Sequence, residues 1–172
     1  MSRKILIFLI ILFLAVLGSI FYFQWKNSQK ESKIISGTRK VLLYYYNPEK
    51  DKDKNGNIKC SRDGLFPIER QIPVSQTPIK DTIELLLKGK ENLTQKELTQ
   101  GITTEFPLDG FKLKSVNLKN DGTLILEFED PLNKTVGGAC RVGILWFQIE
   151  ATAKQFPQVK QVKFLPEELF QP

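Results

Sequence analysis

The 172-residue chain contains no histidine and only two cysteines. Without histidine, Ser-His-Asp and Cys-His catalysis, histidine-ligated zinc and a histidine-based pH switch are excluded. Two thiols alone are too few for a four-cysteine metal site or an iron–sulfur cluster. We therefore expect no cofactor and no enzymatic activity that depends on these groups.

The chain also lacks a strong excess of one charge. Its formal net charge is +6, and its 25 basic residues are scattered, often beside Asp or Glu. This pattern is typical of a solvated surface and predicts no nucleic-acid partner. With 41% hydrophobic and 26% charged residues, the length and composition predict one globular domain.

One long segment, residues 5–23, carries no charge and is strongly apolar. A helix of this length spans roughly 28 Å, close to the thickness of a bilayer's hydrocarbon core. Tyr22 and Trp25 lie at its far edge, where aromatic side chains favour the membrane interface. The segment predicts a single-pass transmembrane anchor, with residues 1–4 as a cytoplasmic tail.

Cleavage of this segment is an alternative. Residues 16–18 loosely resemble a signal-peptide cleavage site, but the apolar run continues beyond them, which favours an uncleaved anchor. No cysteine lies near its end, so we expect no lipoprotein-type anchor. Basic residues on both sides leave the orientation open by charge alone.

The rest of the chain divides into a polar linker, residues 24–38, a folded domain, residues 39–166, and a short tail, residues 167–172. The domain begins with a continuous β-branched and aromatic run, residues 41–46, which is typical of a strand covered on both faces. Prolines flank the next apolar segment, residues 65–72, and predict a short edge strand.

Two main helices follow from capping signals and periodicity. Thr77 and Pro78 suit the N-cap and first helical positions of a helix that stops at Gly89. A longer helix is expected over residues 141–155. Between them, a threonine at 94 and a glutamate at 97 have capping-box spacing and predict a short helical turn.

Residues 111–129 are expected to form a hairpin. A two-residue turn would place apolar residues opposite polar ones. A three-residue loop instead pairs Leu118 with Leu124 and Val116 with Leu126, which unites the apolar faces. We therefore predict the three-residue loop.

A last strand is expected over residues 159–165. The resulting order, β-β-α-β-β-α-β, predicts an α+β, two-layer domain. We expect a mostly antiparallel sheet of about four or five strands, covered by the two main helices and preceded by the transmembrane helix.

Six segments of the domain form a recognisable series: VLLYYYNP, LFPIERQIP, TPIKDTIELLLKG, KLKSVNLKNDGTLILEFED, GGACRV and QFPQVKQVKF. In this order they resemble the GerMN domain, the family named for sporulation and spore germination, over about residues 40–164. The resemblance implies a bacterial, extracytoplasmic, membrane-anchored binding domain with no chemistry of its own. Many members are lipoproteins or carry tandem copies, whereas this sequence has one copy and no lipidation cysteine.

The resemblance and the anchor favour a disulfide between Cys60 and Cys140, because paired cysteines in exported domains are usually bonded. Two buried free thiols in a cytosolic domain would be the alternative. The disulfide would in turn place the folded domain outside the cytoplasm.

The loop after the first strand partly fits a calcium-binding pattern. Asp51, Asp53 and Asn55 have the spacing of the first three oxygen ligands of an EF-hand loop. Arg62 stands where the bidentate glutamate is required, and lysines surround the loop. A solvated loop without metal is therefore the preferred interpretation.

Two apolar residues of the last helix, Ile144 and Phe147, point away from its predicted core face. Either the C-terminal tail, at Leu169 and Phe170, covers them, or they form a candidate interaction surface. The sequence leaves both possibilities open, with the tail preferred.

Together these features predict a non-catalytic interaction module of the bacterial cell envelope that binds an unidentified envelope protein. The alternative is a peptidoglycan or other envelope-polymer binding protein, or an accessory of a hydrolase. The densest carboxylate cluster, Glu127, Glu129 and Asp130, is expected to serve solubility on the outer face of the hairpin and not catalysis.

Overall fold

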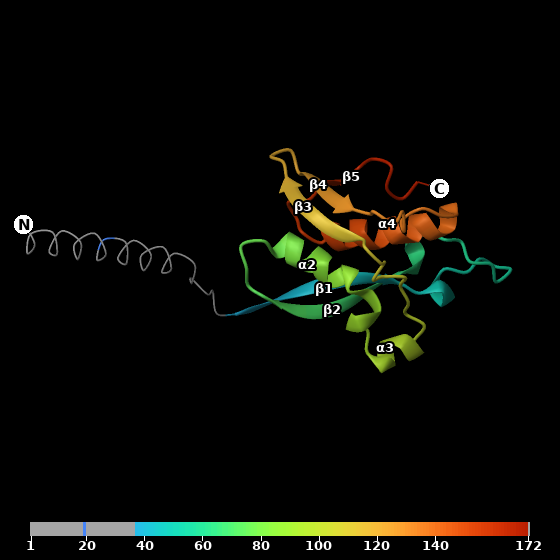
Figure 1. Cartoon of the computed structure of the whole chain (residues 1–172). Helices are drawn as coiled ribbons and strands as arrows, with labels where there is room; N and C mark the ends of the chain where they lie inside the picture. The colour runs from blue at the N-terminus through green and yellow to red at the C-terminus, as the bar shows by residue number, and fades with distance from the viewer. Residues whose placement is uncertain (1–18, 20–36, 172) are drawn as a thin grey trace, which may run out of the picture. The chain divides into compact units, whose positions relative to one another are not determined.

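The computed structural model of the chain describes Ser19 and residues 37–171 (Figure 1). Apart from Ser19, the predicted cytoplasmic tail and anchor lie outside the described residues, as does most of the linker. In the part of the chain that is described, no helix combines the length and apolar character needed to cross a membrane.

The first sheet has two antiparallel strands, β1 (Thr38–Tyr46) and β2 (Leu65–Pro73). Along β1, Val41, Leu43 and Tyr45 are almost completely buried, whereas the residues between them are half-buried. The strand therefore has one core face, and its other face is only partly covered. Two short 3-10 turns, η1 (Pro48–Lys50) and η2 (Arg62–Gly64), lie in the connection to β2.

The second sheet contains β3 (Lys112–Leu118), β4 (Thr123–Glu129) and β5 (Gln161–Leu165) in that order. β3 and β4 form the predicted antiparallel hairpin, whereas β5 runs parallel to β4. A parallel neighbour requires a crossover connection, which the long helix α4 (Ala139–Lys154) supplies.

The other helical elements lie between β2 and β3 along the chain. They are α2 (Pro78–Leu87), a short 3-10 helix η3 (Gly89–Asn92) and α3 (Gln95–Thr99). Figure 1 shows α2 and α4 between the two sheets, and the contacts agree: α2 packs against β1, β3 and α4, while α4 packs against β1 and β5. The core therefore lies around this helix pair.

The α+β class and the two main helices are confirmed. The strands, however, divide into two sheets and do not form the single sheet expected from the sequence. The two sheets stay separate because α4 covers the edge of β1 that does not pair with β2. Gln155 accepts a hydrogen bond from the Leu42 backbone N–H at 2.7 Å and donates one to the Leu42 carbonyl at 2.7 Å. Thr152 accepts one from the Tyr44 N–H at 3.0 Å.

Several local predictions are confirmed. Val116 pairs with Leu126 and Leu118 with Leu124 in the hairpin, so the apolar faces coincide. The loop glycine has a φ of 88°, in the left-handed region that glycine adopts without strain. Pro78 opens α2, and the capping box before α3 is present with both of its hydrogen bonds.

An aromatic cluster packs the second sheet against α4 and the C-terminal segment. Ring centroids lie 4.8 Å apart for Phe111 and Phe128, 4.8 Å for Trp146 and Phe164, and 5.2 Å for Phe164 and Phe170. Burial of such rings is a large source of stability. The cluster joins β4, β5, α4 and the end of the described chain in one core.

Candidate functional site

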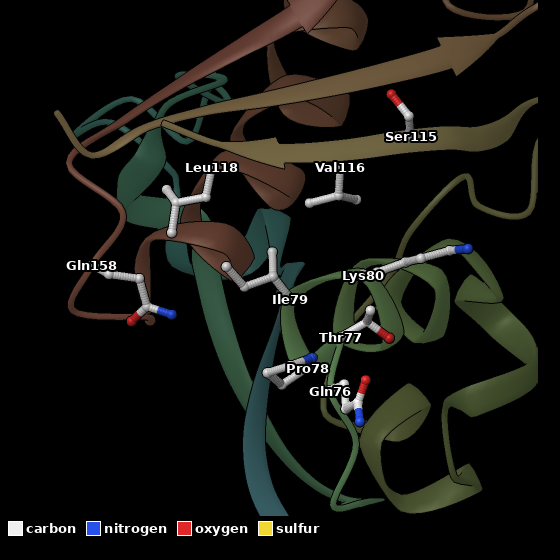
Figure 2. Close-up of a pocket in the computed structure, with 9 residues that line it drawn as sticks. All are labelled: Gln76, Thr77, Pro78, Ile79, Lys80, Ser115, Val116, Leu118 and Gln158. Atoms are coloured by element: carbon white, nitrogen blue, oxygen red, sulfur yellow. The ribbon is translucent and has the colours of Figure 1, made fainter. Parts of the chain in front are cut away.

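A groove of about 430 Å³ lies between the start of α2 and strand β3 (Figure 2). Val116 and Leu118 of β3 point toward Ile79 of α2 and form an apolar floor. The rim is polar and is lined by Gln76, Thr77, Lys80, Ser115 and Gln158. An apolar floor with a polar rim is a common design of binding sites for peptides and small molecules.

The N-terminal end of α2 shapes one wall of the groove. Thr77 is the N-cap residue, but its hydroxyl makes no cap bond to the helix backbone and instead donates to the Asp81 carboxylate at 3.1 Å. The hydroxyl of Ser75 also bonds to Asp81. The Asp81 carboxylate is thus occupied by two hydroxyls. Lys80 is the charged residue in the lining of the groove.

The predicted interaction surface on α4 is partly covered. Ile144 and Phe147 are both half-buried. The guanidinium of Arg62 lies 4.1 Å from the centroid of the Phe147 ring, in a cation–π arrangement, and donates to Glu150 at 2.5 Å. Arg62 therefore covers Phe147.

The C-terminal residues lie elsewhere, so the preferred explanation, a tail over Phe147, needs correction. Leu169 and Phe170 are buried, and Phe170 packs against Phe111, Trp146 and Phe164. The tail completes the aromatic cluster because its one aromatic ring, that of Phe170, packs favourably against the other rings there. The sequence does not indicate whether the tail packs over Phe147 or against Trp146, since both lie on apolar faces of the same helix.

The loop between β1 and β2 is tied to the start of α4. Cys60 and Cys140 form the predicted disulfide, with their Cα atoms 5.2 Å apart and a sequence separation of 80. Cys60 has a φ of 55°, which is uncommon for a residue with a side chain. The bond fixes the loop near Arg62 and Phe147.

Asp51, the first expected calcium ligand, is fully buried and organises this loop. Its carboxylate accepts hydrogen bonds from the Tyr46 hydroxyl at 2.5 Å and from the Ser61 backbone N–H and hydroxyl at 2.6 and 2.5 Å. Burial opposes its ionisation, but these bonds and the nearby Lys59 ammonium outweigh burial and lower its pKa. Asp51 thus acts as a structural acceptor.

The other two expected ligands, Asp53 and Asn55, lie at the exposed tip of the loop. One carboxylate oxygen of Asp53 accepts hydrogen bonds from the backbone N–H groups of Asn55 and Asn57, both at 2.8 Å. This is a turn in which an aspartate replaces a backbone acceptor. Among the described residues, no group of three or more acidic or cysteine side chains is arranged to hold a metal ion.

The carboxylate cluster at the end of β4 is engaged in surface pairs. Glu127 and Glu129 lie 2.9 Å from the ammonium groups of Lys114 and Lys112 respectively. Asp130 accepts hydrogen bonds from the Lys134 N–H and from Thr135, which shape the following loop. These contacts give each carboxylate a structural role.

Most of the sequence of the folded domain matches a known family. The sequence matches the Germane family, described as sporulation and spore germination, over residues 42–168. The chain belongs to this family. Its defining unit, the GerMN domain, therefore accounts for the whole of the fold described above.

Solved GerMN domains have a similar fold. The tandem GerMN domains of the sporulation protein GerM from Bacillus subtilis align with a TM-score of 0.51 and 20% identity, covering 79% of this chain and 42% of that one. The first GerMN domain of the same protein aligns with a TM-score of 0.47 and 22% identity, covering 72% and 80%. None of the curated proteins compared with the chain matches it.

Sequence reasoning did not identify the groove of this GerMN domain. It placed Val116 and Leu118 on an apolar face, which is correct, but a pattern of apolar residues does not distinguish a sealed core from a groove floor. That distinction depends on β3 being the outer strand of its sheet. The proline at the start of α2, which places Lys80 and Thr77 at the rim, was the available signal.

Proposed function

We propose that this GerMN domain is a non-catalytic protein-interaction module of the bacterial cell envelope. In this proposal residues 5–23 anchor the chain in the cell membrane and the folded domain lies outside the cytoplasm, where it helps to assemble an envelope complex. The observation that carries the proposal is the groove between α2 and β3, with its apolar floor and polar rim.

The lining of the groove supports binding more than chemistry. It contains one charged side chain, Lys80, and the rest are apolar side chains, amides and hydroxyls. General acid–base catalysis most often uses a histidine or a carboxylate within reach of a bound substrate, and the lining contains neither. A surface that only has to recognise a partner needs shape and a few polar groups, which the groove has.

An extracytoplasmic location agrees with the disulfide, since such bonds persist mainly in oxidising compartments. This part of the proposal can be tested alone, by labelling thiols in intact cells with a membrane-impermeant maleimide. The proposal expects labelling of Cys60 and Cys140 only after reduction. Labelling of both without reductant would contradict the disulfide, and absence of labelling after treatment with a membrane-impermeant reductant would contradict the location.

The decisive test is photo-crosslinking of the full chain in cells. A benzophenone amino acid at Gln158, on the groove rim, should give a discrete crosslinked protein. The same residue at Lys54, at the exposed loop tip, serves as the control and should not. If neither position gives a protein crosslink while the chain is retained on purified peptidoglycan, the envelope-polymer alternative replaces the proposal.

The α4 surface is a second place where a partner could dock, and Phe147→Asp tests it. Phe147 is half-buried beneath Arg62, so we expect the free energy of unfolding to change by under about 1 kcal/mol. Trp146→Asp is the control and should unfold the domain, because a charge would enter the aromatic cluster. Loss of the crosslink with Phe147→Asp would move the docking face from the groove to α4.

A further inference from the structure

The outer edge of β2 is protected against pairing with another strand. The Asn47 N–H bonds to the Gly64 carbonyl, and the Val74 N–H bonds to the Gly37 carbonyl. Because hydrogen-bonded and non-hydrogen-bonded residue pairs alternate along an antiparallel ladder, these two bonds fix which residues of β1 and β2 bond to each other. It follows that five residues of β2 direct their backbone groups outward, namely Leu65, Pro67, Glu69, Gln71 and Pro73. The two prolines have no N–H to donate, which is a common protection of edge strands.

The outer edge of β3 carries no proline beside the groove, and the irregularity in its pairing with β4 lies just before Val116, between Leu113 and Ser115. The Lys119 N–H bonds to the Thr123 carbonyl at 2.9 Å, so Asn117 and Ile125 form the next hydrogen-bonded pair. Val116 and Leu118 therefore direct their N–H and C=O groups away from β4. Within residues 37–171, these outward groups bond to no other element.

The same two residues also form the floor of the groove. In a strand, side chains at alternate positions share a face, and those of Val116 and Leu118 point toward Ile79 (Figure 2). An extended segment laid along β3 would therefore find free backbone groups and an apolar floor at one place. Added strands gain affinity from the backbone bonds and specificity from pockets for alternate side chains.

The charge around the groove selects among possible occupants. β3 and the residue after it carry three lysines and no acidic residue, and Lys80 stands on the rim. Lys112 and Lys114 form ion pairs with half-buried glutamates of β4, and Lys80 lies 3.7 Å from Glu84, so the positive field is moderate. Asp81, the acid that follows Lys80 on α2, is held by hydroxyls.

This charge disfavours two occupants that belong to the chain itself. A second copy paired edge to edge would bring the lysines of two identical β3 strands together. The linker, residues 24–36, contains three lysines and one glutamate and has the same sign of charge as the strand. An acidic segment has the complementary charge.

We propose that the groove binds an extended acidic segment of a partner protein, which adds to β3 as a fourth strand. The segment pairs with the backbone of Val116 and Leu118 and places alternate apolar side chains over Ile79. Its carboxylates then point to the opposite face of the sheet, where Lys112 and Lys114 lie, while Lys80 attracts the segment from the rim of the groove. This inference rests on the proposed interaction function and names the class of partner.

The test measures binding of short peptides to the purified full chain in detergent by fluorescence anisotropy. The probe is a labelled ten-residue peptide of alternating Glu and Val. Its counterparts carry Lys in place of each Glu, or N-methyl groups on alternate backbone nitrogens. We expect each counterpart to bind at least about tenfold more weakly, because one loses the charge match and the other the backbone pairing.

Two variants place the site. Val116→Pro removes one outward N–H without removing a β3–β4 bond and should weaken binding of the Glu–Val peptide about tenfold. Because proline could disturb the hairpin, Lys80→Glu provides an independent test and should weaken the Glu–Val peptide while strengthening the Lys–Val peptide. Lys88→Glu, an exposed position at the other end of α2, is the matched control and should change neither.

Each outcome decides a separate point. Equal binding of the N-methylated peptide would overturn strand addition, and equal binding of the Lys–Val peptide would overturn the acidic preference. Absence of binding to the Glu–Val peptide, or dimerisation of the full chain that Val116→Pro abolishes, would overturn the inference as a whole. The proposed interaction function would survive any of these results if the Gln158 crosslink in cells persists, so the two can fail separately.

Discussion

The two sheets of the domain are held and protected by different means. The first sheet is tied to α4 by hydrogen bonds from Gln155 and Thr152, and the loop after β1 is tied to the same helix by a disulfide. The second sheet is packed by aromatic rings. The outer edges of the first sheet are covered or carry prolines, whereas β3 has an open edge beside an apolar groove.

This difference indicates where strand pairing is prevented and where it is permitted. Unprotected edges promote aggregation, and natural domains usually protect them. A domain that protects the outer edges of one sheet and leaves the β3 edge of the other open beside an apolar groove favours addition of a strand at β3. The predictions below test how firmly the first sheet is closed.

The largest effect is expected from the disulfide, which ties the first sheet's loop to α4. The double variant Cys60→Ser with Cys140→Ser releases a closed loop of 80 residues. On the chain-entropy model, we expect the free energy of unfolding to fall by roughly 4 kcal/mol, measured by denaturant titration. Wild-type protein in reductant should match the double variant, and a variant as stable as the oxidised protein would contradict the prediction.

Gln155→Ala opens the edge of β1 that α4 covers. The change leaves the N–H and carbonyl of Leu42 without their side-chain partner, so we expect a loss of about 2 kcal/mol in the free energy of unfolding. Gln158→Ala is the matched control: that glutamine is exposed, and its loss should cost under about 0.5 kcal/mol. Equal effects would show that the α4 bonds do not close the sheet.

Glu97→Gln weakens the link between β2 and α3. The Arg70 guanidinium bonds to both oxygens of Glu97, at 2.9 and 2.7 Å, and lowers the pKa of Glu97 from 4.5 to about 2. Because the folded protein favours the ionised form, this stabilisation is present above pH 4.5 and is lost as the pH falls toward 2. We expect the variant to be about 1 kcal/mol less stable at pH 7.

The control for this prediction is the pH profile itself. Denaturant titrations of both proteins between pH 7 and pH 2 should converge as Glu97 of the wild type becomes protonated. A difference in stability that stays constant across this range would mean that the glutamate acts through packing and not through its charge.

The smallest effect on stability, and a distinct effect on association, is expected from Pro67→Val. Valine restores an outward N–H on β2 and adds strand propensity, so the free energy of unfolding should change by under about 0.5 kcal/mol. Sedimentation at increasing concentration should show more self-association than wild type. Pro131→Val, in an exposed loop, is the control; equal behaviour of the two variants would show that Pro67 does not protect the edge.

Local features of the fold were predictable because they depend on neighbouring residues. The hairpin register follows from matching two apolar faces across a short loop, and Thr94 and Glu97 form their capping box within a single turn. The disulfide pairing was predictable for another reason: the chain has only two cysteines. In each of these cases the sequence allows few alternative structures.

The long-range arrangement of the strands was harder to predict from the sequence. Periodicity identifies the buried face of a strand but not its neighbour, so the split into two sheets was missed. The strand–helix–strand order of β4, α4 and β5 is itself a signal for parallel pairing, and it could have been used. Gln148 and Thr152 are fully buried on α4, although polar residues on a helix usually indicate a solvated face.

The groove depends on both local features, which were predictable, and a long-range feature, which was not. Its residues were recognised as apolar, but the open edge exists only because β3 is last in its sheet. Asp51 is a different case: the calcium pattern named it as a ligand and the preferred interpretation was a solvated loop, whereas the structure buries it as a structural acceptor. Its partners, Tyr46 and Ser61, lie five and ten residues away, and only the folded loop brings their donors to one carboxylate.

The same loop has a practical use in protein engineering. Its base is closed by the bridge between Lys52 and Ile58 and by the buried Asp51, while its tip, at residues 53–57, is exposed. Exposed loop tips with a fixed base tolerate inserted sequence well. A fluorescent tag or affinity epitope placed between Asn55 and Gly56 would therefore make the protein detectable in living cells while the domain keeps its native fold.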